Sequence, residues 1–238
     1  MFTGKLKSIF RGESGSVPSG AAASGVTATR SAGTGGIALR KPARKEPPSL
    51  RQSRGLEQFF FNLRDVVGLS ILDFAGANQD NINFLINLGH KVYSQDLVRS
   101  LDEFFGHDPA EQTNAARIEA FIQQNFDYPA DTFDGVLLWD SLQFMSPALL
   151  NATMERLAMV MRPQAYLLAF FTASERATEV PSHEFRIVDS KSIRVTSRGD
   201  RPTGQVFNNR NLERLFGKFE SVKFFLTRDN LREVIVRR

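Results

Sequence analysis

One stretch, residues 69–96 (LSILDFAGANQDNINFLINLGHKVYSQD), constrains the fold more than any other part of this sequence. It begins with the compact, β-prone run Ser70 to Phe74, which the small residues Ala75-Gly76-Ala77 interrupt. Asn78 and Asp80 follow, and both residue types favour a helix start because their side chains accept hydrogen bonds from its first amides. The pattern therefore predicts a strand that turns sharply into a helix.

The rest of this stretch completes a strand–helix–strand unit. Apolar residues recur at helical spacing after the turn, and Gly89 supplies the left-handed residue that commonly ends a helix. Residues 90–94 then have the pattern of a second strand, which leads to Asp96. Such a βαβ unit implies parallel strands, a right-handed crossover and a ligand crevice at the carboxyl ends of the strands. The apolar helix face consists of Ile82, Leu85, Ile86 and Leu88.

Asp96 stands at the carboxyl end of the second predicted strand, and two interpretations of it stay open. An acid in this place commonly accepts hydrogen bonds from the two hydroxyls of a ribose. Aspartate is also a preferred N-cap residue, and the next predicted helix begins at Leu97. The sequence therefore predicts a role for Asp96 at the crevice, at a helix start, or at both.

Size and composition limit the classes of protein to which the chain can belong. With 238 residues, it is long enough for one sizeable α/β domain. It contains no cysteine, which excludes disulfides, thiol catalysis and cysteine-ligated metal sites. The three histidines are far apart in the sequence and lack the spacing of a metal site.

Charge separates an N-terminal tail from the rest of the chain. Residues 1–54 carry ten Lys and Arg against two acids, a net charge of +8, whereas the whole chain carries +4. The remainder is therefore acidic on balance and gives no signal for nucleic-acid binding. Residues 12–48 are rich in Gly, Ser, Ala, Thr and Pro, which cannot bury enough surface to form a core. We thus predict a disordered basic tail over 1–48 and a folded domain over 49–238.

The first residues and the overall hydropathy bear on localisation. Met1 to Arg11 (MFTGKLKSIFR) places apolar and basic residues at amphipathic helical spacing, so this segment contacts an anionic surface or partner, or else it is a frayed end. It lacks the continuous apolar run of a secretory signal, and no run of about 18 apolar residues occurs in the chain. The expected location is the cytoplasm.

Helical and strand patterns alternate after Asp96. Gly135 to Trp139 is a continuous apolar run typical of a buried strand, and Asp140 stands just past its carboxyl end. Residues 173–208 are polar with short β-prone pieces, which predicts an insertion that covers the crevice and the substrate. Strands over 221–226 and 233–237, with a turn at 228–230, predict a terminal antiparallel hairpin. The other predicted elements are helices over 56–67, 97–105, 109–123, 147–160 and 211–216, a weak third strand over 125–128, and a strand over 165–171.

Several motifs in this order resemble those of class I S-adenosylmethionine-dependent methyltransferases. They are Ile71-Leu72-Asp73, the helix that leads to Asp96, residues 133–140 (FDGVLLWD), and Leu157 to Pro163 before the next strand. The resemblance covers residues 55–238. It implies a Rossmann-like methyltransferase fold, that is, a doubly wound, mostly parallel seven-stranded α/β sheet with a C-terminal antiparallel hairpin.

The resemblance also implies the cofactor, S-adenosylmethionine, and the residues that hold it. The turn after the first strand approaches the methionine part, and Asp96 takes the ribose hydroxyls. Asp127 pairs with the adenine amino group, with Phe126 and Tyr128 packed on the ring. Asp140 faces the methionine end and the substrate. The full predicted cofactor site is Asp73, Ala75, Gly76, Ala77, Asn78, Asp96, Leu97, Phe126, Asp127, Tyr128 and Asp140.

The turn departs from the family pattern. Where the family has glycine, this chain has Ala75, Ala77 and Gln79, and Gly76 is the one glycine left. Glycine is used in such turns because it permits positive φ and lets the backbone approach a ligand closely. Either the turn is rebuilt around Gly76 and Asn78, whose side chain tolerates positive φ, or the cofactor site is lost.

Three functions compete at this point. The first is a methyltransferase that acts on an unidentified small-molecule acceptor, which needs no catalytic residue because the cofactor drives the reaction. The second is a catalytically inactive binding or assembly module with the same fold. The third, a nucleotide-dependent oxidoreductase, lacks its glycine fingerprint. Each of the three histidines is either a surface or capping residue or a general base. His183, in the predicted insertion, is the best candidate for a base, and Glu184 and Arg186 beside it either bind substrate or are solvated.

Overall fold

A computed structural model describes residues 47–174, 177–227 and 231–238. The chain divides into two units, residues 1–41 and 42–238, and all described residues belong to the second. The tail predicted over 1–48 lies almost entirely outside the described residues. The predicted turn at 228–230 lies outside them as well. Among the described residues, no helix has the length and apolarity needed to span a bilayer.

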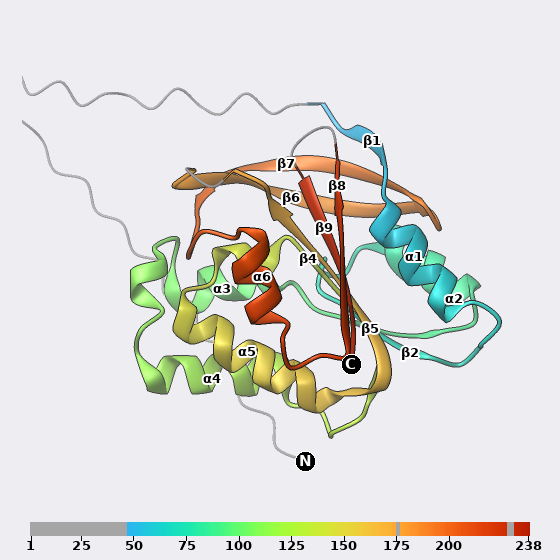
Figure 1. Ribbon diagram of the computed structural model, residues 1–238, viewed down its shortest axis with the longest axis horizontal. Helices are drawn as coiled ribbons and strands as arrows, with labels where there is room; N and C mark the ends of the chain where they lie inside the picture. The colour runs from blue at the N-terminus through green and yellow to red at the C-terminus, as the bar shows by residue number, and fades with distance from the viewer. Residues whose placement is uncertain (1–46, 175–176, 228–230) are drawn as a thin grey trace, which may run out of the picture. The chain divides into compact units, whose positions relative to one another are not determined.

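The described domain alternates strands and helices in most of its length (Figure 1). The strands are β1 (Ser49–Gln52), β2 (Ser70–Asp73), β3 (Lys91–Ser94), β4 (Phe133–Trp139), β5 (Met161–Thr172), β6 (Glu179–Asp189), β7 (Ser192–Pro202), β8 (Ser221–Leu226) and β9 (Leu231–Arg237). The α-helices are α1 (Arg54–Leu63), α2 (Gln79–Asn87), α3 (Leu97–Phe105), α4 (Ala115–Phe126), α5 (Pro147–Val160) and α6 (Asn209–Leu215). Short 3-10 turns lie at Pro109–Glu111 and Ser141–Phe144.

The main sheet has six strands in the order β3-β2-β4-β5-β9-β8. Strands β3, β2, β4 and β5 are parallel, whereas β9 is antiparallel to both of its neighbours. This order confirms the predicted βαβ unit over 69–96, the doubly wound parallel sheet and the C-terminal hairpin. Because the chain runs outward from β2 to β3 and then returns to β4, the sheet has a switch point between β2 and β4, where ligands bind in such folds.

The prediction of seven strands was wrong, because the third strand does not form. Asn125 and Phe126 are the last residues of α4, and Phe126 is fully buried in the core. The Tyr128 amide turns back to the Phe126 carbonyl at 2.8 Å, and Pro129, which has no amide hydrogen, follows. Packing of the helix face therefore overrides the short β-prone segment, and β3 becomes the edge of the sheet.

Side chains alternate across the main sheet and build one core on each face. On one face, Leu72, Val136 and Leu167 pack with the apolar residues of α3, α4, α5 and α6. On the other, Ile71 and Leu137 pack with α1, α2 and the β6–β7 hairpin. Figure 1 shows the same division, with α3 to α6 on one side of the sheet and α1 and α2 on the other.

The predicted insertion over 173–208 forms a second sheet. Strands β6 and β7 pair as a long antiparallel hairpin, and β1 adds to β7, giving the order β1-β7-β6. One face of this hairpin is apolar and buried through Phe185, Ile187, Ile193 and Val195. The hairpin is therefore longer and better packed than the short β-prone pieces in the sequence indicate.

Helix boundaries follow the capping residues. Asp96 caps α3 and Ser146 caps α5, which has Pro147 in its first turn. The helix predicted over 109–123 is interrupted, and α4 starts only after its own cap, Asn114. The helix predicted over 56–67 ends at Leu63, so the last residues of the predicted face lie outside it.

Candidate functional site

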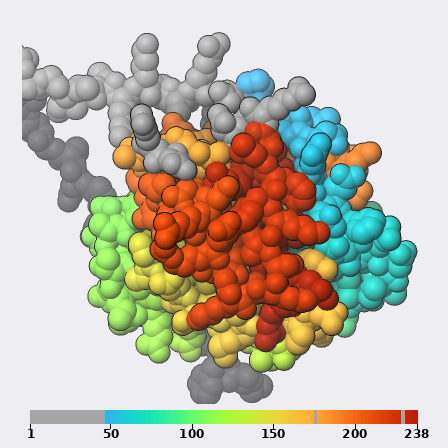
Figure 2. Space-filling model, in the orientation of Figure 1, coloured from blue at the N-terminus to red at the C-terminus, as the bar shows by residue number. Residues whose placement is uncertain are grey.

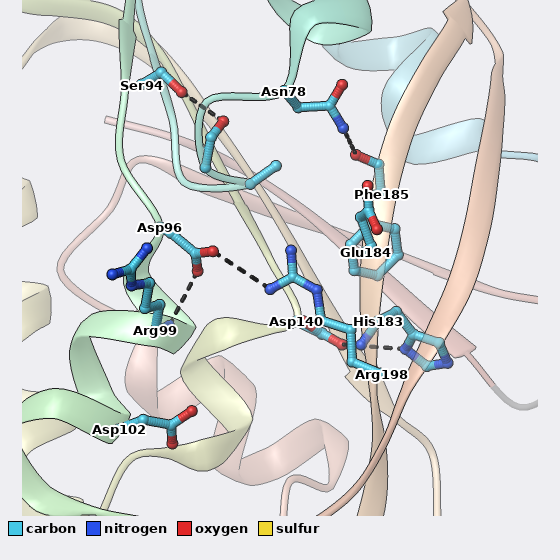
Figure 3. Close-up of polar contacts among 12 residues, drawn as sticks. Asn78, Ser94, Asp96, Arg99, Asp102, Asp140, His183, Glu184, Phe185 and Arg198 are labelled. Carbon is cyan, nitrogen blue, oxygen red and sulfur yellow. Dashed lines mark hydrogen bonds and ion pairs between the residues drawn. The ribbon is translucent and has the colours of Figure 1, made fainter. Parts of the chain in front are cut away.

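The carboxyl ends of β2, β3 and β4 bring together three segments that the sequence predicts at one crevice. They are the loop from Phe74 to Asn78, Asp96 after β3, and Asp140 after β4 (Figure 3). Ala75 forms an isolated bridge with Asp96, which holds the loop against the end of β3. The predicted juxtaposition of the turn with Asp96 is therefore present.

Gly76 is the residue around which the loop turns. It has φ of +85°, and a Cβ at this position would lie 3.2 Å from the Asp96 side chain. Its amide donates to the Gln95 carbonyl at 3.0 Å, and the Ser94 hydroxyl donates to the Gly76 carbonyl at 2.5 Å. Asn78 instead has φ of −89° and caps α2 by accepting from the Asp80 amide. The turn is thus rebuilt on Gly76, and the positive φ proposed for Asn78 was wrong.

Asp73 is fully buried below this loop and is occupied by protein donors. Its carboxylate accepts from Trp139 Nε1 at 2.6 Å, from Asn81 Nδ2 at 2.9 Å and from the Ala75 amide at 3.0 Å. Burial raises the pKa of Asp73 from its ordinary value, and these three donors oppose the rise. Asp73 therefore fixes the loop and the Trp139 ring from beneath. Neither partner side chain was singled out from the sequence.

Asp96 caps α3 and lies at the wall of the crevice, and its contact with a ribose stays a prediction. Its Oδ1 accepts from the Arg99 amide at 3.0 Å and so caps α3. Its Oδ2 lies 3.5 Å from the Arg198 guanidinium on β7, and about a quarter of the side chain (27%) is exposed. Because it also lines the cleft beside the loop, its outer oxygen is placed to meet a ligand.

A cleft of about 370 Å³ opens between the loop, Asp96 and the β6–β7 hairpin. This volume lies at the lower end of the range for small-molecule sites. Its charged side chains are paired, since Arg186 contacts Glu184 at 2.8 Å and Asp80 at 3.3 Å. The hydrogen bond that Arg186 donates to Glu184 raises the pKa of Arg186 further. The cleft is lined by Ala75, Gly76, Ala77, Asn78, Gln79, Asp80, Asp96, Glu184, Arg186 and Arg198.

Asp140 and His183 form a buried pair at the end of β4. Asp140 Oδ2 accepts from the His183 amide at 2.9 Å and lies 3.1 Å from His183 Nδ1. Both side chains are almost buried, with exposures of 2% and 10%. A carboxylate bonded to Nδ1 holds the ring with Nε2 as its free proton acceptor. The sequence identified both residues separately, but it gave no sign of their contact across 43 positions.

The inner part of the crevice is filled by the protein itself. Only about 10 Å³ remains among Trp139, Asp140, His183 and Phe185, which is barely the space of one water. The Phe185 ring stacks on Trp139, and the Phe185 carbonyl accepts from Asn78 and Asn81 side chains at 3.4 and 3.3 Å. The β6–β7 hairpin thus closes the crevice from above.

Five residues of the predicted cofactor site line neither of these cavities: Asp73, which is buried beneath the loop, and Leu97, Phe126, Asp127 and Tyr128. Phe126 is buried against Phe74, with ring centroids 5.2 Å apart, and Leu97 is buried in the first turn of α3. Asp127 is exposed at the C-terminus of α4, and Tyr128 packs on Phe133. Their contact with an adenine ring stays a prediction.

The cleft presents an acid and backbone groups to a ligand. Asp96 offers a carboxylate at its wall, and the loop backbone lies close to it, since a Cβ at Gly76 would be only 3.2 Å from the Asp96 side chain. In the described part of the chain, the Ala77 amide has no hydrogen-bond partner and is a further donor at the cleft. No group of three or more potential metal ligands occurs among the described residues.

Comparisons with known proteins give matches in structure only. No family model and no curated protein matches the chain. A 1,6-didemethyltoxoflavin-N1-methyltransferase from Burkholderia thailandensis, solved with S-adenosylhomocysteine, has 12% identity and a TM-score of 0.44 over 77% of this chain and 76% of that one. A SAM-dependent methyltransferase from Methanosarcina mazei has 14% identity and a TM-score of 0.44 over 75% and 96%.

A SAM-dependent methyltransferase from Aquifex aeolicus has 14% identity and a TM-score of 0.42 over 76% of this chain and 88% of that one. The protein class in these matches is the one that the sequence motifs resemble. Because the TM-scores are below 0.5, the fold described above rests on its own strand order.

Proposed function

We propose that this protein is an S-adenosylmethionine-dependent methyltransferase that acts on a small-molecule acceptor. One observation carries the proposal: the cleft lies at the carboxyl ends of β2 and β3 of a doubly wound sheet, beside the switch point, between a tight glycine turn and Asp96 at the next strand end. Nucleoside ligands bind in this place in open α/β sheets, with an acid on the ribose.

Different residues of the cleft contact different parts of the cofactor. Asp96 Oδ2 accepts from the ribose hydroxyls, which requires Arg198 to move aside from its 3.5 Å contact. The turn at Gly76 and the Ala77 amide approach the cofactor next to the ribose, on the side of its methionine part. When bound, the cofactor supplies an electrophilic methyl group on a sulfonium, so the protein mainly aligns the acceptor with it.

The Asp140–His183 pair is suited to an acceptor that must lose a proton. Asp140 orients the ring through Nδ1, so that Nε2 can take a proton from a hydroxyl or an ammonium group. Both residues line the inner part of the crevice, next to the expected methionine end. The pair therefore serves as the general base of the proposed reaction.

The proposed function requires the β6–β7 hairpin to open. With about 10 Å³ in the inner crevice, neither the methionine part nor an acceptor has room while Phe185 lies on Trp139. Lid segments that exclude water in this way are common in enzymes. The closed arrangement is thus the resting state, and ligands bind the open one.

Titration calorimetry of the full chain with S-adenosylmethionine and S-adenosylhomocysteine tests the proposal. We expect saturable binding with a Kd in the micromolar range, about 8 kcal/mol of binding free energy. Asp96→Asn keeps an N-cap side chain for α3 but removes the charge, so it is expected to weaken binding about tenfold without loss of stability. Asp108→Asn, at a cap outside the cleft, is the matched control and leaves binding unchanged.

A catalytically inactive binding module is the second candidate, and the filled inner crevice favours it. Here Trp139, Phe185 and the buried pair are permanent packing, and the fold serves another ligand or partner. The same titration separates the two functions. Absence of binding at about 1 mM of either ligand rejects the methyltransferase and leaves the binding module.

A further inference from the structure

Four large apolar side chains are exposed together at the ends of α1 and α2. Phe61, Val66, Val67 and Leu88 have exposed fractions of 52, 51, 79 and 41%, and all four line one cavity. We call them the α1–α2 patch. Figure 2 shows this part of the chain, coloured blue to cyan, at one side of the described domain. Soluble monomers rarely expose such a concentration of apolar side chains, which marks an interaction surface.

The patch contains both a hollow and projecting side chains. The hollow has about 540 Å³, and the buried side chains of Phe60, Leu63 and His90 form part of its lining. Val67, the most exposed of the four, stands at its rim. Because a projecting side chain stands beside a hollow, two copies related by a twofold axis can each insert this side chain into the hollow of the other.

The backbone of residues 64–68 holds the Val66 and Val67 side chains outward. Asp65 has φ of +66°, an uncommon conformation for a residue with a side chain. The Gly68 amide donates to the Gly89 carbonyl at 2.8 Å, and the Val67 side chain lies 3.3 Å from where a Cβ of Gly89 would be. The loop is therefore fixed against the end of α2. The exposed positions of Val66 and Val67 follow from this fixed backbone.

Charges at the rim favour a copy of this chain over an anionic membrane. Glu57 and Asp65 carry negative charge and Arg64 positive charge, and all three line the hollow. Arg64 lies 3.8 Å from the Phe61 ring centroid and 3.6 Å from Asp65. A rim with both signs pairs with itself across a twofold axis, whereas its acidic excess opposes an anionic lipid surface.

From these observations we infer that the protein forms a homodimer through the α1–α2 patch. Val67 of one copy enters the hollow of the other, and Arg64 faces the acids of its partner. The patch lies at the amino end of β3, next to His90, whereas the cleft lies past its carboxyl end at Asp96. The dimer therefore leaves the cleft free, while Ser190 in the turn of the β6–β7 hairpin also lines the hollow.

Sedimentation velocity of the full chain tests this inference. We expect the wild type to be a dimer at about 100 µM. Val67→Asp places a charge in the interface and is expected to give a monomer with an unchanged melting temperature. Val206→Asp is the matched control, because Val206 is also exposed (41%) but lies outside the patch.

A wild type that is monomeric at this concentration overturns the inference, and so does a Val67→Asp variant that stays dimeric. Flotation with phosphatidylserine vesicles adds a second arm. Vesicle binding of the wild type that Val67→Asp abolishes would assign the patch to a membrane and overturn the dimer. Loss of the dimer leaves ligand binding at the cleft unchanged, so this result is independent of the proposed function.

Discussion

Phe185 and Trp139 stack face to face, with ring centroids 5.1 Å apart and ring planes at 10°. One ring comes from the β6–β7 hairpin and the other from the end of β4, so this contact closes the crevice. Trp139 is the only tryptophan of the chain, and its indole also donates to the buried Asp73. Tryptophan fluorescence therefore reports directly on hairpin closure.

Phe185→Ala is expected to open the crevice. Removing a buried phenylalanine costs about 3 to 5 kcal/mol of unfolding free energy, and here it also removes the ring that covers Trp139. We predict a red-shifted Trp139 emission and S-adenosylhomocysteine binding at least as tight as in the wild type. Phe216→Ala, a buried phenylalanine near α6, is the control that loses stability with unchanged emission. Unchanged emission in Phe185→Ala would contradict hairpin closure by this stack.

Asp102→Asn is expected to loosen the hairpin and strengthen ligand binding. Asp102 on α3 holds Arg201 of β7 by two hydrogen bonds of 2.6 and 2.8 Å. The side chain of Asp102 is about one-third exposed (32%), so its charge contributes about 1 kcal/mol at most to closure. Because ligands bind the open state, the apparent Kd falls by up to about fivefold in calorimetry. Glu103→Gln, which breaks an exposed pair with Arg99 on the same helix, is expected to leave Kd unchanged.

Gly76→Ala tests the rebuilt turn. Alanine at φ of +85° costs about 1 kcal/mol, and its Cβ would also crowd Asp96 at 3.2 Å. Gly106→Ala is the control, because it has φ of +67° but open space around the added Cβ. We predict a larger loss of unfolding free energy in urea for Gly76→Ala, with weakened ligand binding that the control does not show. Equal losses and equal binding would mean that Gly76 has no special contact with Asp96.

Because His90 is buried, we predict that the free energy of unfolding depends on pH. Burial lowers the pKa of His90 below its ordinary value of 6.5, and Asp134 opposes the shift only in part. The unfolded chain then binds a proton that the native protein does not, so stability is full above pH 6.5 and falls as pH decreases through the folded pKa. His90→Gln is expected to flatten this slope in urea unfolding between about pH 7 and 5. An identical slope in the variant would show that His90 is not responsible.

Most of the main sheet follows from local patterns in the sequence. The βαβ unit over 69–96 was predicted because its apolar spacing, Gly89 and Asp96 each act within a few residues. The absence of the third strand was not predicted, because the burial of Phe121 and Phe126 in the core decides where α4 ends. Short β-prone segments carry no signal of this tertiary packing.

The sequence predicted which segments border the candidate site, but it did not predict the contacts that close the crevice. The turn, Asp96 and Asp140 were placed by their positions after strands. The contacts that close the crevice join distant residues, as in the hydrogen bond from the Ile187 amide to Asn81 across 106 positions. One available signal was the alternation of Phe185 with Ile187 and of Ile193 with Val195, which is typical of a strand face that packs on a core.

Fluorescence titration of the wild type tests the central claim most directly, that a nucleoside cofactor binds this crevice when the hairpin opens. S-Adenosylhomocysteine is added to the full chain while the emission of Trp139 is followed, with Asp96→Asn as the binding-impaired comparison. We predict a saturable red shift in the wild type at micromolar ligand and a titration curve displaced to higher concentration in the variant. Emission that stays constant up to about 1 mM ligand would contradict the claim.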